Sequence, residues 1–208
     1  MPVMRRSKGI DRECSGGRHV IGSPRLLFRS LTMWDLRLTT ALASDPEAQR
    51  WLGWKQDDVV AEDERDRLLS APARRGRSRF GLPSFAMPTA GMLAVDPGCG
   101  LPAGALILTP ESEDLCQVGG YLAPSYRGRG LGAELFTAGL ALAQWHLHFT
   151  EVRAVVHPEN LACARSLGRA GFAPAAGPET YTLPDGRVIP AAWYSSVTLA
   201  PGWCPSAW

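Results

Sequence analysis

The sequence predicts a mixed α+β domain in which a mostly antiparallel sheet is flanked by helices. Three observations predict it. Short apolar runs between residues 91 and 122 are joined by tight turns, which connect antiparallel strands. A glycine-rich loop at residues 127–132 is followed at once by a long apolar-periodic segment, which predicts a helix. A strand pattern and a short helix pattern then follow between residues 151 and 171.

The composition is that of a globular protein. The 208 residues are 45% hydrophobic and 20% charged, which is enough for one domain with a buried core. The net charge of +2 does not indicate nucleic acid as a partner. No apolar run is long enough to span a membrane, and the basic N-terminus lacks the apolar segment of a signal peptide. We therefore expect a cytoplasmic protein without a membrane partner.

The cysteines and histidines do not predict a metal site. Five cysteines stand at positions 14, 99, 116, 163 and 204, and none belongs to a Cys-x-x-Cys pair. An odd number at these spacings predicts neither a zinc site nor a disulfide framework, and free thiols agree with a reducing compartment. His146 and His148 lie near the end of a predicted helix, where capping or surface roles are favoured.

The chain is expected to divide into three parts. Residues 1–23 are rich in Arg, Ser, Gly and Lys without periodicity, which predicts a disordered basic tail. Residues 24–200 form a single domain, and residues 201–208 form an irregular tail. A basic arm that contacts nucleic acid is the alternative interpretation of the first segment.

The first elements of the domain are predicted from local signals. A strand begins at Arg25. Thr32 and Asp35 have the spacing of a capping box, which predicts a helix as far as Ala43. Asp45-Pro46 then predicts a second helix start, with proline at the first helical position.

A bulky cluster and two charged segments follow. Trp51, Leu52 and Trp54 predict either core packing or the wall of a pocket. Residues 57–70 predict a charged surface helix. The basic run that follows, with Arg at positions 74, 75, 77 and 79, predicts a solvated loop or a contact to a phosphorylated ligand.

Three strands and a helix surround the glycine-rich loop. The strands are predicted at residues 91–95, 104–109 and 116–122, and Asp96-Pro97-Gly98 supplies the turn chemistry between the first two. The helix after the loop presents one apolar face, formed by Leu131, Leu135, Ala138, Leu142, Trp145 and Phe149.

The last third of the chain adds a strand, a helix and a hairpin. The strand covers residues 151–156, and Asn160 is placed to cap a helix that ends at Gly171. A hairpin is predicted from residues 179–183 and 188–198, around Pro184-Asp185-Gly186.

The stretch at residues 118–132 reads as a strand, a glycine-rich loop and a helix N-terminus, which together bind anions. Gly128-x-Gly130-x-x-Ala133 also matches a dinucleotide fingerprint, and that interpretation is rejected because hairpin strands precede the loop and Glu151 precedes its strand. A Walker loop is rejected because no Gly-Lys-Ser/Thr follows. The residue pattern of this stretch, taken by itself, therefore predicts a site for a phosphate group and does not identify the ligand that carries it.

Residues 25 to about 199 resemble the GCN5-related N-acetyltransferases (GNAT), in particular the branch that acetylates protein N-termini, including ribosomal proteins. RLLFRSLTMWDL, GYLAPSYRGRGLG and VRAVVHPENLACARSLGRAGF, followed by LPDGRV, carry the resemblance. It implies the GNAT fold, with a sheet splayed at its fourth strand, and acetyl-CoA as donor.

The resemblance also implies binding residues. Tyr121 and Leu122 would pair with the pantetheine amides, and the Asn160 side chain would reach the same arm. The pyrophosphate would bind the backbone amides of Arg127, Gly128, Arg129, Gly130, Leu131 and Gly132.

Catalytic residues are less well defined. Gln117 stands where relatives often have a glutamate base, Leu167 where many have a tyrosine, and Cys163 where the ribosomal branch has a serine. Cys163 or Ser166 could protonate the leaving thiolate. A water chain could then lead to a base at Glu111, Glu113 or Asp114, or Tyr194 or His157 could take part. Cys163 as an apolar filler and Gln117 as a strand-surface residue remain alternatives.

The predicted function is direct transfer of an acetyl group to a primary amine, on a protein N-terminus or a small molecule. A catalytically silent acyl-CoA-binding module is the alternative, because the usual Glu and Tyr are missing. Nicotinamide-dependent redox chemistry is not expected. The sequence is compatible with a homodimer as well as with a monomer.

Overall fold

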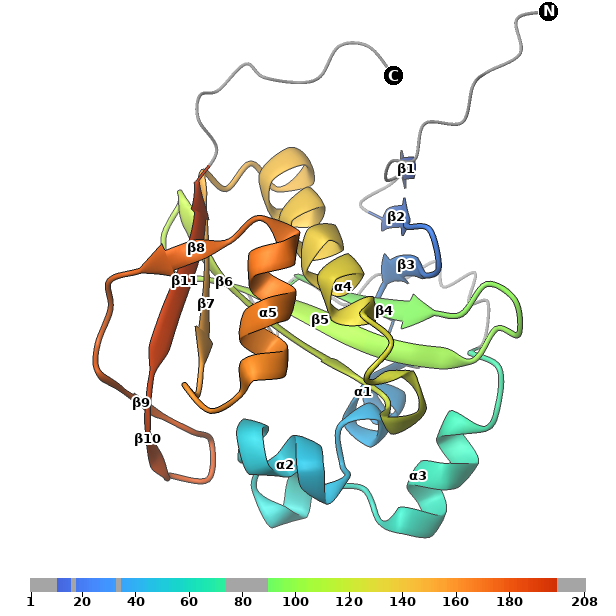
Figure 1. Cartoon of the computed structure of the whole chain (residues 1–208). Helices are drawn as coiled ribbons and strands as arrows, with labels where there is room; N and C mark the ends of the chain where they lie inside the picture. Colours follow the sequence, from blue (N-terminus) through green and yellow to red (C-terminus); the bar gives the residue numbers. More distant parts are fainter. Residues whose placement is uncertain (1–10, 16–17, 33–34, 74–89, 198–208) are drawn as a thin grey trace, which may run out of the picture.

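The computed structural model describes residues 11–15, 18–32, 35–73 and 90–197 (Figure 1). The predicted basic run after residue 73 and the predicted C-terminal tail lie outside these ranges.

One large sheet forms the centre of the described structure. Its strand order is β1-β2-β3-β4-β5-β6-β7-β11-β8, and every neighbouring pair is antiparallel except β6 and β7. The strands are β1 (Asp11–Ser15), β2 (Arg18–Gly22), β3 (Leu27–Ser30), β4 (Ala90–Val95), β5 (Pro102–Pro110), β6 (Leu115–Leu122), β7 (Glu151–Val156), β8 (Ala173–Ala175) and β11 (Ala192–Val197). The predicted fold class, a mostly antiparallel sheet with flanking helices, is confirmed.

The two parallel strands separate soon after they meet. β6 and β7 pair only from Leu115↔Glu151 to Gln117↔Arg153. β6 continues as far as Leu122 and β7 as far as Val156 without further pairing to each other. Backbone groups on the facing edges of both strands are therefore left for another partner.

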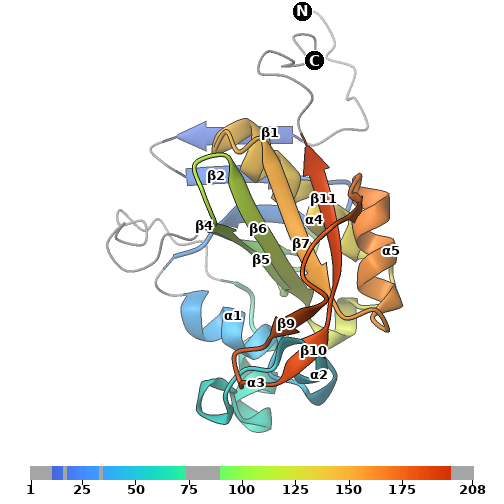
Figure 2. The same cartoon turned by 90° about the vertical axis from the view of Figure 1, so that its left-hand side faces the viewer.

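Helices cover both faces of the sheet (Figure 2). They are α1 (Leu36–Leu42), α2 (Pro46–Leu52), α3 (Glu62–Leu69), α4 (Leu131–Leu140) and α5 (Leu161–Ala170). On β6, Gly120 lies against Leu135 of α4, while the phenol of Tyr121 reaches Thr39 of α1. Because successive strand residues point to opposite faces, α4 and α1 lie on opposite faces of the sheet.

The apolar face predicted for the helix after the loop is buried over its first three turns. Leu131, Leu135, Ala138 and Leu142 are all nearly inaccessible. Trp145 is 38% exposed, because the helix widens into a π-helical segment at Ala141–His146. A π-turn has more residues per turn than an α-helix, so the heptad-like spacing no longer keeps Trp145 on the buried face.

The predicted caps at Asp45 and Gly171 are confirmed, whereas the predicted capping box does not cap α1, whose N-cap, Asp35, makes no side-chain cap hydrogen bond. The Asp35 carboxylate accepts hydrogen bonds from the backbone and hydroxyl of Thr32, but α1 itself begins only at Leu36. Asp45 caps α2 by accepting from the Ala48 N–H at 3.2 Å. At the end of α5, Gly171 adopts the left-handed conformation expected of a C-cap.

Two predictions about the chain are wrong. The disordered tail was expected to reach residue 23, but β1 and β2 extend the sheet and Ile21 is fully buried. The expected strand at residues 188–198 is divided, with β10 (Val188–Pro190) pairing with β9 (Thr180–Thr182) in a separate ribbon and β11 pairing with β7. Ala191, whose N–H donates to Glu179 O, stands at the break.

Within the described residues, no helix has the length and apolar character needed to cross a bilayer.

Candidate functional site

The glycine-rich loop joins the end of β6 to the start of α4. A 3-10 turn at Pro124–Tyr126 follows the strand, and Gly128 and Gly130 then take left-handed conformations with φ of 72° and 73°. Within the described part of the chain, the backbone N–H groups of residues 128–132 donate to no protein acceptor. Unpaired amides at the positive end of a helix dipole are groups that favour an anion, and the predicted anion site at this loop stays a prediction.

Gly132 has a different role from the two left-handed glycines. A Cβ at this position would lie 2.5 Å from the Ser166 Oγ of α5, so the absence of a side chain lets the two helices approach closely. The Ser166 hydroxyl donates to the Ala162 carbonyl oxygen at 2.8 Å. Ser166 therefore lies at the anion-binding end of the site, beside the first turn of α4.

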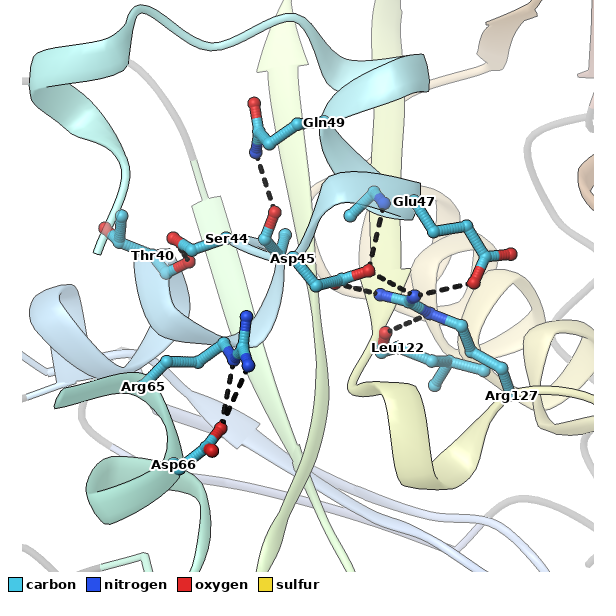
Figure 3. A network of polar contacts seen from close by, with 11 residues as sticks. Thr40, Ser44, Asp45, Glu47, Gln49, Arg65, Asp66, Leu122 and Arg127 are labelled. Atoms are coloured by element: carbon cyan, nitrogen blue, oxygen red, sulfur yellow. Dashed lines mark hydrogen bonds and ion pairs between the residues drawn. The ribbon is translucent and has the colours of Figure 1, made fainter. Parts of the chain in front are cut away.

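The side chain of Arg127 turns away from the loop toward α2 (Figure 3). Its two terminal nitrogens contact the Asp45 carboxylate at 2.7 and 2.6 Å, and Nη1 also lies 3.2 Å from Glu47. Its Nε donates to the Leu122 carbonyl oxygen at 3.0 Å, and its backbone N–H donates to Pro124 O. The Arg127 amide, which the resemblance implies as a pyrophosphate ligand, thus already has a partner within the protein.

The Asp45 carboxylate is held ionised by this contact. Burial acts to raise the pKa of Asp45, but hydrogen bonds from Arg127 and from the Ala48 N–H outweigh it and lower the pKa. The same contact raises the pKa of Arg127. The pair is ionised throughout the neutral range.

A cavity of about 590 Å³ extends from the loop into the space between β6 and β7. Of the binding residues named from the sequence, Tyr121, Leu122, Arg127, Gly128, Gly130, Leu131, Gly132 and Asn160 line it. Arg129 does not; its guanidinium lies over the Tyr126 ring, 5.5 Å from the centroid. α2 and the β9–β10 ribbon form the remaining wall, through Trp51, Leu52, Tyr181, Leu183 and Ile189.

Two of the implied pantetheine contacts are partly occupied by the protein itself. The Asn160 Oδ1 accepts the Cys163 N–H at 3.1 Å and caps α5, which leaves the side-chain NH₂ for a ligand. The Leu122 carbonyl oxygen is bonded to Arg127.

Comparison with known proteins identifies the family. The family model described as "Acetyltransferase (GNAT) domain" matches residues 25–173. The chain belongs to the GNAT acetyltransferase family. It is thus an acyltransferase, and the fold of the sheet and the flanking helices is the one this family has. No curated protein sequence gives a significant match.

Solved structures share the fold of this GNAT protein at low identity. A ribosomal-protein-S5-alanine acetyltransferase from Vibrio fischeri is 16% identical, with 88% of this chain and 99% of that chain covered and a TM-score of 0.64. A spermidine N-acetyltransferase from Vibrio cholerae, in complex with CoA and spermine, is 15% identical over 83% and 95% of the two chains, with a TM-score of 0.63. AAC(6')-Ib with ribostamycin and coenzyme A is 20% identical over 83% and 93%, with a TM-score of 0.59.

The three catalytic candidates of this acetyltransferase lie in different surroundings. Cys163 and Ser166 line the cavity, whereas Gln117 does not and stands at the last paired position of β6 and β7. Burial raises the pKa of the Cys163 thiol to about 12, and its side chain packs against the core. A thiol of this kind is protonated at neutral pH and is a weak acid.

Other groups considered from the sequence fall inside and outside the cavity. Glu111, Glu113, Asp114 and Tyr194 do not line it, whereas His157 does. The His157 Nδ1 accepts the Glu159 N–H at 3.1 Å, so the neutral ring carries its proton on Nε2. The ring also packs against Trp51, at 5.5 Å between centroids.

Glu47, Arg165 and Arg169 also line the cavity and were not identified from the sequence. They lie on helix surfaces, where charged residues are common, so no local pattern distinguishes them. Of the cysteines, histidines and acidic residues in the described ranges, no three are grouped so as to hold a metal ion.

Proposed function

We propose that this protein transfers an acetyl group from acetyl-CoA directly to a primary amine, on a protein N-terminus or a small molecule. The observation that carries the proposal is the continuity of one cavity, from unpaired backbone amides at the start of α4 to the separated edges of β6 and β7. Acetyl-CoA has a diphosphate that would bind the amides at α4, and a long arm with amide groups that would bind the strand edges.

The backbone of the loop supports the proposed position of the diphosphate. The diphosphate would accept hydrogen bonds from the N–H groups of residues 128–132, and Gly130, whose φ is 73°, lets it approach the chain closely because no side chain projects there. The guanidinium groups of Arg165 and Arg169 add positive charge to the same cavity. The free NH₂ of Asn160 and the unpaired edge of β6 up to Tyr121 would take the pantetheine arm.

The acetyl thioester supplies the activated acyl group, so the protein has little bond chemistry to perform. The amine must reach the thioester as the neutral base, and the thiolate must leave. Backbone N–H groups of the separated strands are available near the reacting carbonyl, where they would stabilise the developing oxyanion. Holding the two substrates next to each other in one cavity can supply a large part of the rate enhancement of acetyl transfer.

Neither Cys163 nor Ser166 is well suited to protonate the thiolate. The Cys163 thiol is a weaker acid than an ordinary thiol, because burial raises its pKa to about 12. The Ser166 hydroxyl is engaged with Ala162 O at the phosphate end of the cavity. We therefore infer that the thiolate takes its proton from the solvent or from the attacking amine.

The absence of an evident acid or base in the described cavity favours a second candidate, a silent acyl-CoA-binding module. One experiment separates the two. The protein is mixed with acetyl-CoA and a panel of amines, and free thiol is followed. Thiol release that depends on an amine supports the enzyme; tight CoA binding without release on any amine supports the silent module.

A further inference from the structure

The cavity holds few negative groups for an acceptor to contact. No Asp or Glu falls in residues 1–10, 16–17, 33–34, 74–89 or 198–208, which lie outside the described ranges. Among the acidic side chains that the structure describes, only Glu47 lines the cavity. Three arginines, Arg127, Arg165 and Arg169, line it as well. An acceptor with two or three ammonium groups would therefore need partners for most of them outside the described lining of the cavity.

Glu47 is itself paired. Its Oε2 lies 3.2 Å from Arg127 Nη1, and its side chain is 73% exposed. Two other acidic residues, Asp185 and Glu159, are also engaged, with Arg187 at 2.6 Å and with Arg50 at 3.3 Å. A polycation entering this cavity would therefore find, among the described residues that line it, no carboxylate that is not already paired with an arginine.

The wall formed by α2 and the β9–β10 ribbon is apolar and fixed in place. Asp185 N donates to the Gly53 carbonyl oxygen at 2.7 Å, and a Cβ on Gly53 would lie 2.8 Å from Leu183. This contact joins the C-terminus of α2 to the ribbon. Arg50 already lies over the Trp51 ring, 4.5 Å from the centroid, so Trp51 does not offer that face to an ammonium group.

Among the described residues that line the cavity, no carboxylate or imidazole is free to act as a base. Glu47 is ion-paired, and the His157 Nδ1 is occupied by the Glu159 N–H. An amine must therefore be neutral to a useful extent before it enters. At pH 7.5 an α-amino group, with a pKa near 8, is neutral roughly 200-fold more often than an alkyl amine of the lysine type, with a pKa near 10.4.

We infer that this acetyltransferase selects acceptors with a single, weakly basic amino group beside an apolar substituent, and that it discriminates against polyamines, aminoglycosides and lysine side chains. The inference rests on the proposed transfer to an amine and narrows its acceptor. The α-amino group of a peptide with an apolar first residue has this chemistry.

The test compares four acceptors with the full chain and acetyl-CoA at pH 7.5. They are a short peptide with a free α-amine and an apolar first residue, the same peptide with its N-terminus blocked and one lysine added, spermidine, and ribostamycin. Free thiol and product mass are measured. We expect kcat/KM for the free α-amine to exceed that of each other acceptor by roughly 100-fold.

Each outcome is informative. Spermidine or ribostamycin as an equal or better acceptor would overturn the inference while the proposed function stands. Equal turnover of the lysine peptide and the free α-amine peptide would overturn the inference that the enzyme prefers the less basic amine. Thiol release on none of the four, with CoA still bound, would overturn the proposed function and this inference with it.

A matched pair of variants tests the charge argument separately. Ile189 lies in the cavity wall on β10 and is only partly buried, so Ile189→Glu adds a carboxylate and Ile189→Gln adds a polar group of the same shape. We expect the preference for spermidine, relative to the α-amine peptide, to rise about tenfold in the Glu variant only. The same preference in both variants would overturn the charge argument. Thermal unfolding of both variants checks that they are folded.

Discussion

Arg127 and Asp45 stand 82 residues apart in the sequence and form a two-point ion pair, at 2.7 and 2.6 Å, between the glycine-rich loop and the N-terminus of α2. Arg127 also bonds Leu122 O at the end of β6. One guanidinium group thus connects the loop proposed to bind the donor with the helix that carries the apolar wall of the cavity.

Asp45→Asn should separate the ion pair from the helix cap. Asparagine caps helices as well as aspartate does, so α2 keeps its start while the charge is lost. We expect the free energy of unfolding to fall by about 1–3 kcal/mol, and KM for the amine to rise more than the Kd for CoA. Glu47→Gln is the control, because its exposed pair should contribute less than about 1 kcal/mol. Equal effects of the two variants would contradict this role of Asp45.

Gly130→Glu should abolish CoA binding and leave the fold intact. The added side chain would enter the site of the phosphates and repel them. Because φ is 73° at this position, any side chain adds backbone strain of about 1–2 kcal/mol, and Gly130→Ala measures that contribution alone. We expect titration with CoA to show at least a 100-fold difference between the Glu and Ala variants. Unchanged affinity in Gly130→Glu would refute the proposed position of the diphosphate.

Gly132→Ala should weaken the contact between α4 and α5. The new methyl group would lie 2.5 Å from the Ser166 Oγ, so the helices must separate or the serine must turn. We expect a loss of about 1–3 kcal/mol in stability. Ser166→Ala removes that oxygen, and in the double variant part of the loss should be regained, as a double-mutant cycle in thermal unfolding would measure. Purely additive effects would indicate that the two positions do not interact.

Cys163→Ala distinguishes an acid from a packing residue. The thiol is buried against the core and its pKa is raised to about 12, so we expect kcat to change by less than about threefold and stability to fall by about 1 kcal/mol. Single-turnover thiol release and CoA titration, compared with the parent protein, measure both. A large fall in turnover at unchanged CoA affinity would instead identify Cys163 as the acid.

Stability should decrease in mild alkali. Burial raises the pKa of the Cys116 and Cys163 thiols to about 12, while thiols in the unfolded chain ionise near 8.5. Above pH 9 the unfolded state therefore binds fewer protons than the folded state, and stability falls as pH rises, by about 1.4 kcal/mol per pH unit for each thiol. Denaturant unfolding between pH 9 and 10 should give a smaller slope for Cys163→Ala. An identical slope would contradict the raised pKa.

The features predicted correctly from the sequence are those with a local cause. The turn at Asp96-Pro97-Gly98, the cap at Asp45-Pro46, the cap at Asn160 and the left-handed Gly171 each depend on a few neighbouring residues, and each occurs as expected. The left-handed Gly128 and Gly130 and the start of α4 at Leu131 belong to this group, because glycine spacing and a helix start define them locally. The sequence alone thus determined the order of the elements from β3 onward and the position of the glycine-rich loop.

Pairings between distant segments were decided only by the tertiary structure. The residues near Arg127 do not indicate that its partner is Asp45. The residues near Ile21 do not indicate that this side chain is buried within the sheet. Glu47 lines the cavity because of the position of α2, and the Arg127 amide donates to Pro124 O within the loop. Such contacts arise from packing over long sequence separations, where side-chain identity permits many partners and only the assembled sheet selects one.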